Sequence, residues 1–458
     1  MHTLLSGKRA KTEQYLHKSV LNIIPTLKIL LGCAGVMVNI GEFNRVIVVY
    51  LTWGETPRTY GVFGSQVIGQ FVETAKSSPN DEFHFISAVP VIHSGLAREK
   101  WSYFSELRNV KKELDTVAFH SMPIIATQNF VNSSKATFSL MHGISHWFLK
   151  RKLTKITPDI VHCRSYHAAW AALSIRKKYS LAFKIVFDGR GLWPEEVALK
   201  RNWSKNSINY QFLKSIEKTL LSECEASVAV SDTMHDHYVD LGAKNDQCIY
   251  LSADTEQLKV DIDHLEQSET VRFCYVGALS EDTWHQPKGL VDLYRRLRTL
   301  FPKTRLTIVT TSNHERLKPQ FSEFPQEELV FSSTKTRVEL KKILEIQDIS
   351  LMTYFTPTNE KQKLLGKMVL AVKTAEYFVA GLPMICNTHC GGAAKLIDDN
   401  GLGVTYFPGK VDSLNSEDLL PYLNADARKK CQSFALKHFD YAVNAGKYVE
   451  LYKLVLKC

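Results

Sequence analysis

Short apolar runs alternate with longer amphipathic segments along most of the chain. The run 45–51 (RVIVVYL) is rich in β-branched residues and too short for a buried helix, which is typical of a central parallel strand. A loop with Gly54, Gly61 and Gly64 follows, and then an amphipathic stretch at 66–76. A strand, a glycine-bearing loop and a helix make the first half of a βαβ unit. Further strands are predicted at 82–88, 124–126, 160–163, 184–187 and 227–230.

The same alternation starts again after a polar, acidic stretch at 252–270, which we interpret as a linker. Alternating strands and helices indicate a parallel sheet that is covered by helices on both faces. The sequence therefore predicts an α/β protein with two doubly wound parallel sheets in series. The strands of the second sheet are predicted at 271–276, 305–310, 328–331, 349–354, 383–387 and 403–406, with helices such as 290–300, 337–346 and 372–380 between them.

Four segments follow from this pattern. They are an N-terminal extension (1–44), a first Rossmann-like domain (45–251), a second Rossmann-like domain (252–436) and a closing C-terminal helix (437–458). The stretch 424–456 reads as one or two helices. Open α/β sheets bind ligands at the carboxyl ends of their strands, so two such domains facing each other would bind them in the cleft between.

The first 44 residues differ from the rest. Basic residues precede a mostly apolar stretch at 20–40, which Pro25 and Lys28 interrupt. A lysine near the centre of a spanning helix costs about 2.5 kcal/mol or more. We therefore expect an interfacial or disordered extension. A signal anchor is one alternative, and an over-long start, with Met37 as the natural beginning, is the other.

Composition and charge narrow the class of protein. Hydrophobic residues make up 45% and charged residues 23%, which excludes a disordered, collagenous or coiled-coil protein. The net charge of +10 fits an anionic partner: nucleic acid, a phosphorylated substrate or an acidic membrane. The nine cysteines are scattered without a CxxC pair, which argues against a disulfide framework or a structural zinc site. We expect a reducing compartment and a cytoplasmic location.

The most informative segment is 373–385 (KTAEYFVAGLPMI). Lys373 and Glu376 lie near the start of a predicted helix, Gly381 ends it and Pro383 begins the next strand. A carboxylate at Glu376 could accept hydrogen bonds from a ribose diol, and Lys373 with free helix amides would attract a diphosphate. The alternative is that Glu376 only stabilises the helix start while Lys373 is solvated.

This segment resembles the donor-site helix of the family 4 glycosyltransferases, and the resemblance runs from about residue 45 to 404. Gly277, followed by Lys288 and Gly289, is similar to the family's strand, glycine turn and Lys-Gly that contact the donor phosphates. Gly391, with the glycine after it, resembles the next loop of the family, placed before a helix at 393–398. The resemblance implies the α/β GT-B fold, with two Rossmann-like domains facing across a cleft. It also implies transfer from a nucleotide-sugar donor with retention of configuration, no metal and no cofactor.

Two positions depart from the family's pattern. Met368 stands where the family often has a second glutamate that touches the donor sugar, and Ala278 stands where an arginine is common. Recognition of the donor sugar therefore differs from the family's usual one. Nearby lysines could supply phosphate-binding charge, with solvated lysines as the alternative: Lys361, Lys363 and Lys367.

The first domain carries charged residues in a glycine-bearing turn after a predicted central strand. Asp188 and Arg190 lie in a segment that resembles a subgroup with an Asp-x-Arg-Gly signature, many of whose members act in surface polysaccharide synthesis. Asp188 could position or deprotonate the acceptor hydroxyl, and Arg190 could hold a phosphate or fix the carboxylate. In the alternative, the pair only braces the loop. Arg164, His167 and the loop 54–64 are lesser candidates for the cleft.

Further segments bear on partners. The stretch 141–156 combines aromatic and basic residues without an acidic one, which suits peripheral contact with anionic lipid at the inner face of the membrane; an ordinary packed helix is the alternative. Signatures of an RNA-binding module are lacking, so we expect no nucleic-acid partner. Asp261 and Asp263 form a DxD pair in the linker, a poor place for a metal.

The expected partners are a nucleotide-sugar donor and a glycan or lipid-linked acceptor. The alternatives are a nucleotide-sugar epimerase and a degenerate binding subunit.

Overall fold

The computed structural model describes residues 45–59, 61–90, 100–124, 134–264, 268–280 and 284–458. Residues 46–458 form one compact unit. The extension predicted over 1–44 lies outside the described residues.

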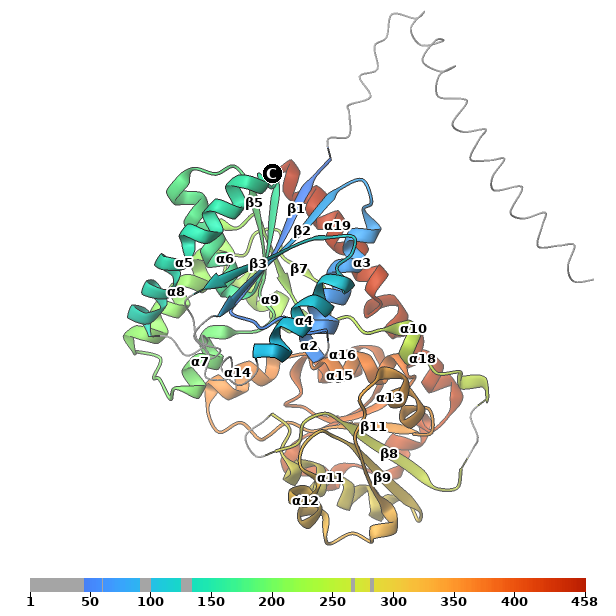
Figure 1. The fold of residues 1–458 in the computed structure, drawn as a ribbon. Helices are drawn as coiled ribbons and strands as arrows, with labels where there is room; N and C mark the ends of the chain where they lie inside the picture. Colours follow the sequence, from blue (N-terminus) through green and yellow to red (C-terminus); the bar gives the residue numbers. More distant parts are fainter. Residues whose placement is uncertain (1–44, 60, 91–99, 125–133, 265–267, 281–283) are drawn as a thin grey trace, which may run out of the picture. The chain divides into compact units, whose positions relative to one another are not determined.

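The first half of the unit, here called the N-lobe, is built on a parallel sheet with the order β3-β2-β1-β4-β5-β6-β7 (Figure 1). One face of the sheet packs against α5, α6 and α8, and the other packs against α3, α4 and the C-terminal α19. The strands are β1 (Ile47–Trp53), β2 (Glu82–Pro90), β3 (Ala118–Ile124), β4 (Ile160–Arg164), β5 (Lys184–Asp188), β6 (Ala226–Ala229) and β7 (Gln247–Cys248). The helices are α2 (Gly61–Phe63), η1 (Gly64–Gly69), α3 (Gln70–Ser77), α4 (Lys100–Glu113), α5 (Lys135–Ile156), α6 (Ser165–Tyr179), α7 (Trp193–Lys200), α8 (Ile208–Glu223) and α9 (Asp232–Asp240).

The second half, here called the C-lobe, repeats this plan with a parallel sheet of order β10-β9-β8-β11-β12-β13. The strands are β8 (Val271–Val276), β9 (Thr304–Val309), β10 (Leu329–Ser332), β11 (Ile349–Met352), β12 (Met384–Asn387) and β13 (Gly403–Tyr406). The helices are α11 (Pro287–Leu300), α12 (His314–Leu317), α13 (Arg337–Leu344), α14 (Glu360–Met368), α15 (Val372–Val379), α16 (Gly391–Asn400), α17 (Ser416–Leu419) and α18 (Ala425–His438). Two parallel, doubly wound sheets confirm the predicted α/β architecture.

Three local predictions were wrong. β3 lies at 118–124, where a strand was expected only at 124–126, and the short β7 was not expected. Both are edge strands, and β3 contains polar residues and Pro123, so neither reads as an apolar run. Gly391 was placed in a loop before its helix, but it is the first residue of α16. A Cβ at Gly391 would lie 2.2 Å from the carbonyl oxygen of Lys367, so the close approach of α14 requires glycine there.

The chain passes between the lobes twice, and the two crossings run side by side. Ala253 and Asp440 form a parallel bridge, and the amide of Ala253 donates to the carbonyl of Phe439 at 2.8 Å. The first crossing leads through α10 (Thr255–Leu258) into the C-lobe, and the second leads from α18 into α19 (Tyr441–Lys457). The predicted closing stretch is thus two helices. α18 packs on α15 of the C-lobe, and α19 returns to the core of the N-lobe.

A second contact joins the lobes away from the crossings. Ser231, at the start of α9, donates its hydroxyl hydrogen to the carbonyl of Met368 at 2.7 Å, and Thr233 donates to the carbonyl of Lys367 at 2.7 Å. The Met368 side chain is buried against the N-lobe core. Met368 therefore packs the seam between the lobes.

Two further predictions can be placed on the structure. The eight cysteines among the described residues are all free thiols. Within the described ranges, the helices are too short or too polar for any of them to span a bilayer.

Because α19 completes one face of the N-lobe sheet, its buried side chains should determine the stability of that lobe. Leu451 is buried in this core, whereas Leu454, one turn away, is 39% exposed. We expect Leu451→Ala to lower the free energy of unfolding by about 2–5 kcal/mol, the usual loss for a buried leucine. Leu454→Ala is the matched control, with an expected change within about 0.5 kcal/mol. Urea unfolding of both variants measures the difference, and equal losses would contradict this packing.

Candidate functional site

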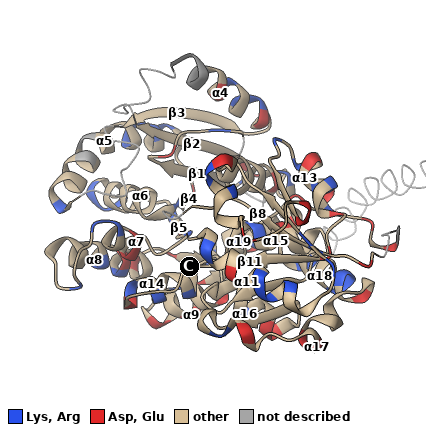
Figure 2. Cartoon of the chain, turned by 90° about the horizontal axis from the view of Figure 1, so that it is seen from below, with Lys and Arg blue, Asp and Glu red and all other residues tan. Residues whose placement is uncertain are grey.

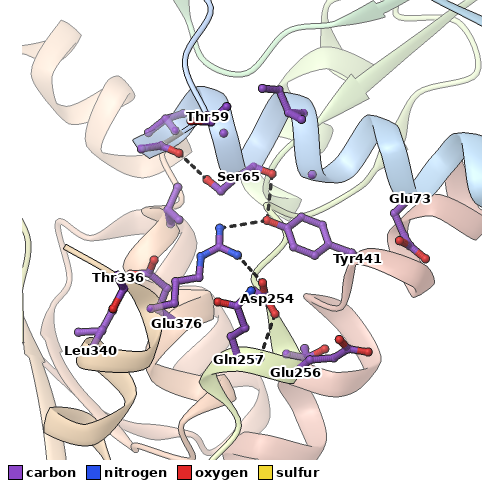
Figure 3. A pocket seen from close by; sticks show the side chains of 18 of the residues that line it. Thr59, Ser65, Glu73, Asp254, Glu256, Gln257, Thr336, Leu340, Glu376 and Tyr441 are labelled. Atoms are coloured by element: carbon purple, nitrogen blue, oxygen red, sulfur yellow. Dashed lines mark hydrogen bonds and ion pairs between the residues drawn. The ribbon is translucent and has the colours of Figure 1, made fainter. Parts of the chain in front are cut away.

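A cavity of about 1120 Å³ opens between the two lobes, beside the crossings. Its walls come from three sources: the helix that begins at Gly61 in the N-lobe, the crossing segments, and the carboxyl ends of C-lobe strands with the helices that follow them. Figure 3 shows Thr59 and Ser65 on the N-lobe side, Asp254 and Gln257 on the opposite side, and Tyr441 between them. This is the place where a two-sheet α/β protein is expected to bind a ligand.

Lys373 forms the most unusual part of the C-lobe wall. Its ammonium nitrogen is buried, lies 3.0 Å from the Tyr275 hydroxyl and stands over the Tyr275 ring at 4.2 Å from the centroid. Burial lowers the pKa of this ammonium group to about 7, and Cys390 and Glu376 offset the effect only in part. The cavity wall therefore contains a cation whose charge the protein only partly balances.

Gly277, at the end of β8, makes room for this lysine. Its φ is +126°, a backbone conformation that side chains rarely adopt, and a Cβ there would lie 2.7 Å from Lys373 Nζ. Gly277 also lines the cavity. Glycine thus lets the backbone end of β8 and the lysine share one side of the site.

Glu376 lies on α15 one turn beyond Lys373 and lines the same cavity. Burial raises the pKa of its carboxyl group, while Arg337 and Lys373 lower it. α15 begins at Val372, and its N-cap Ala371 has no side chain that could satisfy the first amides. The helix start, Lys373 and Glu376 together offer amide and ammonium donors beside a carboxylate acceptor.

Arg337 connects the site with the crossings, and the sequence analysis did not anticipate it. Its Nη1 lies 2.6 Å from the Asp254 carboxylate, and its Nη2 donates to the Tyr441 hydroxyl at 3.5 Å. That hydroxyl donates to the carbonyl of Ser65 at 3.0 Å (Figure 3). One hydrogen-bonded chain therefore links α13, both crossings and the N-lobe helix. The sequence signal here marks only the start of α13, where Thr336 caps the helix through the amide of Glu339 in a Thr-x-x-Glu pattern, and it does not indicate a site.

The N-lobe wall is a continuous helical run from Gly61 to Ser77 with a π-helical segment at Gly64–Gly69. π-helical turns are rare and occur frequently at functional sites. A Cβ at Gly64 would lie 2.2 Å from the carbonyl oxygen of Thr59, so the loop can fold tightly against the helix start only at a glycine. The minor prediction that the loop 54–64 reaches the cleft agrees with the presence of Thr59 and Gly61 in the lining.

Three other predicted donor-site residues are not among the described residues that line the cavity. The Lys288 side chain is 81% exposed, near the start of α11, with its ammonium 3.7 Å from the Asp292 carboxylate. Gly289 packs against Thr353, to which an added Cβ would lie 3.2 Å away. Gly391 packs against α14 as described above. Contact of these residues with donor phosphates stays a prediction.

Asp188 and Arg190 lie in a buried network beneath α19, apart from the described cavity lining. Asp188 ends β5, and its Oδ2 lies 2.6 Å from Arg190 Nη2, 3.3 Å from His162 Nε2 and 3.3 Å from the Tyr448 hydroxyl. Burial would raise the pKa of Asp188, but Arg190 and His162 hold it below its usual value. Arg190 has a φ of +60°, in the left-handed region that non-glycine residues rarely adopt. These contacts fit the alternative in which the pair braces the loop, here against α19, and the catalytic roles remain predictions.

The lesser candidates of the first domain are also buried. Arg164 donates through Nε to the Glu55 carboxylate at 3.0 Å. His167 lies 3.0 Å from His142 among aromatic rings. Within the described ranges, no group of three or more His, Cys, Asp or Glu side chains is arranged to hold a metal ion, and the linker pair Asp261 and Asp263 belongs to no such group.

Comparisons with known proteins agree with this architecture. A family model described as Glycosyltransferase Family 4 matches residues 123–257. No curated protein matches the sequence.

Three solved structures align over nearly the whole chain. Alr3699/HepE from Anabaena in complex with UDP is 13% identical, with 89% of this chain and 99% of that chain covered and a TM-score of 0.58. Sucrose-phosphate synthase from Thermosynechococcus elongatus is 12% identical, with 90% and 100% covered and a TM-score of 0.61. A glycosyltransferase from Rickettsia africae is 16% identical, with 91% and 100% covered and a TM-score of 0.62. At these identities the likeness establishes the fold, which is GT-B as predicted.

The buried pair of Asp188 and Arg190 yields a stability prediction. We expect Asp188→Asn to lower the free energy of unfolding by about 3 kcal/mol or more, because it leaves the Arg190 charge buried without its counter-ion. Adding Arg190→Met should restore part of that loss. The native pKa of Asp188 is depressed, so its contribution is present above the unfolded pKa of about 4 and is lost as the pH falls through the native value. Urea unfolding of the three proteins at neutral and acidic pH measures both effects; a loss in Asp188→Asn that the second substitution does not reduce would contradict the pairing.

Proposed function

We propose that the protein is a glycosyltransferase that moves a sugar from a nucleotide-sugar donor to a glycan or lipid-linked acceptor in surface polysaccharide synthesis. The observation that supports it most is the interlobe cavity, with the partly balanced cation of Lys373 and the carboxylate of Glu376 at the start of one helix. The GT-B fold and the family 4 match over 123–257 also support sugar transfer. We further propose a cytoplasmic location, with the acceptor reached at the inner face of the membrane.

In the proposed reaction, the bond between the anomeric carbon and the diphosphate oxygen breaks, and its electron pair leaves with the diphosphate. An acceptor hydroxyl oxygen forms the new bond to that carbon and gives up its proton, which the departing diphosphate oxygen can accept. Lys373 and the amides that begin α15 stabilise the charge that develops on the diphosphate. Glu376 accepts hydrogen bonds from the ribose diol of the donor. Retention of configuration and independence of metal belong to the proposal through the resemblance to family 4.

Two arguments support the C-lobe as the donor side, and one supports nucleotide binding by this fold. Gly277, Lys373 and Glu376 meet at the carboxyl ends of its strands, where parallel sheets bind ligands. A diphosphate satisfies an ammonium group and helix amides at the same time. One solved structure of the same fold, Alr3699/HepE, contains UDP.

The first test is a thermal-shift panel of nucleotide sugars, because a ligand that binds only the native state raises its melting temperature. We expect at least one nucleotide sugar to stabilise the protein. Glu376→Ala should raise the dissociation constant of that ligand about tenfold or more, the usual cost of losing hydrogen bonds to a charged group. Glu256→Ala is the matched control, since Glu256 is an exposed carboxylate on the same cavity, and it should bind normally. A panel without any stabilising ligand would contradict the proposal.

Turnover separates a transferase from the alternatives. The transferase releases the nucleoside diphosphate only as sugar moves to an acceptor or to water. Release of an isomerised nucleotide sugar without acceptor would identify an epimerase. Tight donor binding without transfer or hydrolysis would identify a binding subunit.

Lys373 makes donor binding depend on pH. With a pKa of about 7 in the free protein, the ammonium group is largely protonated below that pH and loses its proton above it. A bound diphosphate favours the protonated form, so binding above pH 7 requires proton uptake. We expect the dissociation constant to rise up to about tenfold per pH unit between about pH 7 and pH 9. Lys373→Met should bind more weakly and without this slope, and calorimetric titration across the range decides between the two outcomes.

A further inference from the structure

α5 carries large apolar side chains on both of its sides. Its inner side packs into the N-lobe core through Phe138, Leu149 and Leu153. Its outer side exposes Leu140 (65%) and Trp147 (56%), two turns apart. Single exposed apolar residues are common on any protein surface. Here two large ones lie on one side of the same helix, next to the exposed rings of Phe148 and Tyr179. Exposed apolar side chains that cluster in this way mark interaction surfaces.

The apolar side chains of this surface contact one another and cations. The ring of Phe148 (39% exposed) lies 5.0 Å from that of Trp147. The Arg151 guanidinium stands 5.8 Å from the Trp147 ring centroid. On the neighbouring α6, Tyr179 (38% exposed) lies beneath the ammonium groups of Lys150 and Lys178, at 5.4 Å and 5.5 Å. Aromatic rings and positive charges therefore alternate over two adjacent helices.

The charge of this surface is of one sign. Figure 2 shows Lys and Arg, and no Asp or Glu, along α5, and the sequence from Ser134 to Pro158 contains no acidic residue. Among the ion pairs between described residues, none includes Lys150, Arg151 or Lys178. The adjacent Lys177, by contrast, lies 2.5 Å from the Glu223 carboxylate. The cations that flank the exposed rings thus remain available to an external anion.

We propose that this surface, the α5 surface (Leu140, Trp147, Phe148, Lys150, Arg151, Lys178 and Tyr179), docks the protein onto an anionic lipid bilayer. Tryptophan and tyrosine suit the boundary between water and hydrocarbon, because one part of each ring is apolar and another part hydrogen-bonds. The lysines and arginine meet anionic headgroups. Leu140, the most exposed of these apolar side chains, favours lipid over nucleic acid, because an aliphatic side chain gains little from bases or phosphates but inserts readily into acyl chains.

The α5 surface and the cavity are made from different elements of the chain, since no residue of α5 is among the described lining residues. Docking can therefore leave the cavity accessible. The inference rests on the proposed function in one respect: the use of docking would be to bring the N-lobe to a lipid-linked acceptor at the membrane. Docking itself can be measured without any sugar transfer.

The test is co-sedimentation of the full chain with vesicles of phosphatidylcholine, with and without about one third phosphatidylglycerol. We expect binding to the anionic vesicles only, with loss of binding as salt rises to about 0.5 M. The variant Trp147→Ala/Arg151→Glu removes one exposed ring and reverses one charge. Each unit of positive charge near an anionic surface raises the affinity about fivefold. The change from arginine to glutamate alters the charge by two units, so this variant should bind about 25-fold more weakly, or more weakly still because a ring is also lost. The matched control Phe407→Ala/Lys410→Glu makes the same chemical change at exposed positions of the C-lobe and should bind normally.

Thermal melting of each variant shows that its fold is intact, and a melting shift with any nucleotide sugar that stabilises the unaltered protein shows that its cavity is intact. Absence of binding to anionic vesicles would overturn the inference while leaving the proposed function untouched. Equal binding by both double variants would exclude the α5 surface. A parallel titration with single-stranded RNA distinguishes the remaining partner class: RNA binding that depends on Trp147 and Arg151, without vesicle binding, would overturn the lipid proposal in favour of nucleic acid.

Discussion

The two crossings between the lobes are the constraint on which the site depends. They are bridged to each other at Ala253 and Asp440, and α19 continues the second crossing into the core of the N-lobe. The C-terminal helix therefore belongs to the first sheet, although it follows the second in sequence. This return places Tyr441 between the N-lobe helix and Arg337 of the C-lobe. Some of the residues that join the lobes also line the cavity, so a ligand that contacts Arg337 or Tyr441 also contacts the joint.

The second constraint is electrostatic. Desolvation makes a charge at Lys373 costly in the free protein, and its hydrogen-bonding partner is the neutral hydroxyl of Tyr275. A protein that used this lysine for stability alone would pair it with a nearby carboxylate, as it does at Arg337 with Asp254. An incoming polyanion supplies the missing charge, and the favourable free energy appears on binding rather than on folding. Gly277 fits this view, because its missing side chain is what gives the ammonium group its position.

The sequence predicted the fold closely because buried parallel strands are continuous apolar runs, and these mark every strand except the two edges of the N-lobe sheet. β3 and β7 were not predicted correctly, because edge strands tolerate polar residues and proline and therefore lack a continuous apolar run. For the site, the segment around Lys373 and Glu376 was identifiable from its helix-start pattern. Arg337, Asp254 and Tyr441 were not, because they come from three segments that only the crossings bring together. Lys288 shows the converse difficulty: a local Lys-Gly pattern fixes the start of α11 but not the direction in which an exposed side chain points.

Asp188 illustrates how burial changes the interpretation of a motif. A carboxylate at the end of a central strand suggests a base, and the Asp-x-Arg-Gly pattern strengthens the suggestion. A base must reach its substrate within hydrogen-bonding distance, however, and Asp188 is fully buried beneath Tyr448 and Arg190. Its contacts run to α19, the helix that continues the second crossing. The pair holds the end of β5 against the element that positions Tyr441, and the catalytic role of Asp188 stays a prediction. Because Asp188 is the buried counter-ion of Arg190, its substitution lowers stability under either role. A bracing role predicts that activity recovers together with stability in the variant Asp188→Asn/Arg190→Met, whereas a base that contacts substrate would leave that variant inactive.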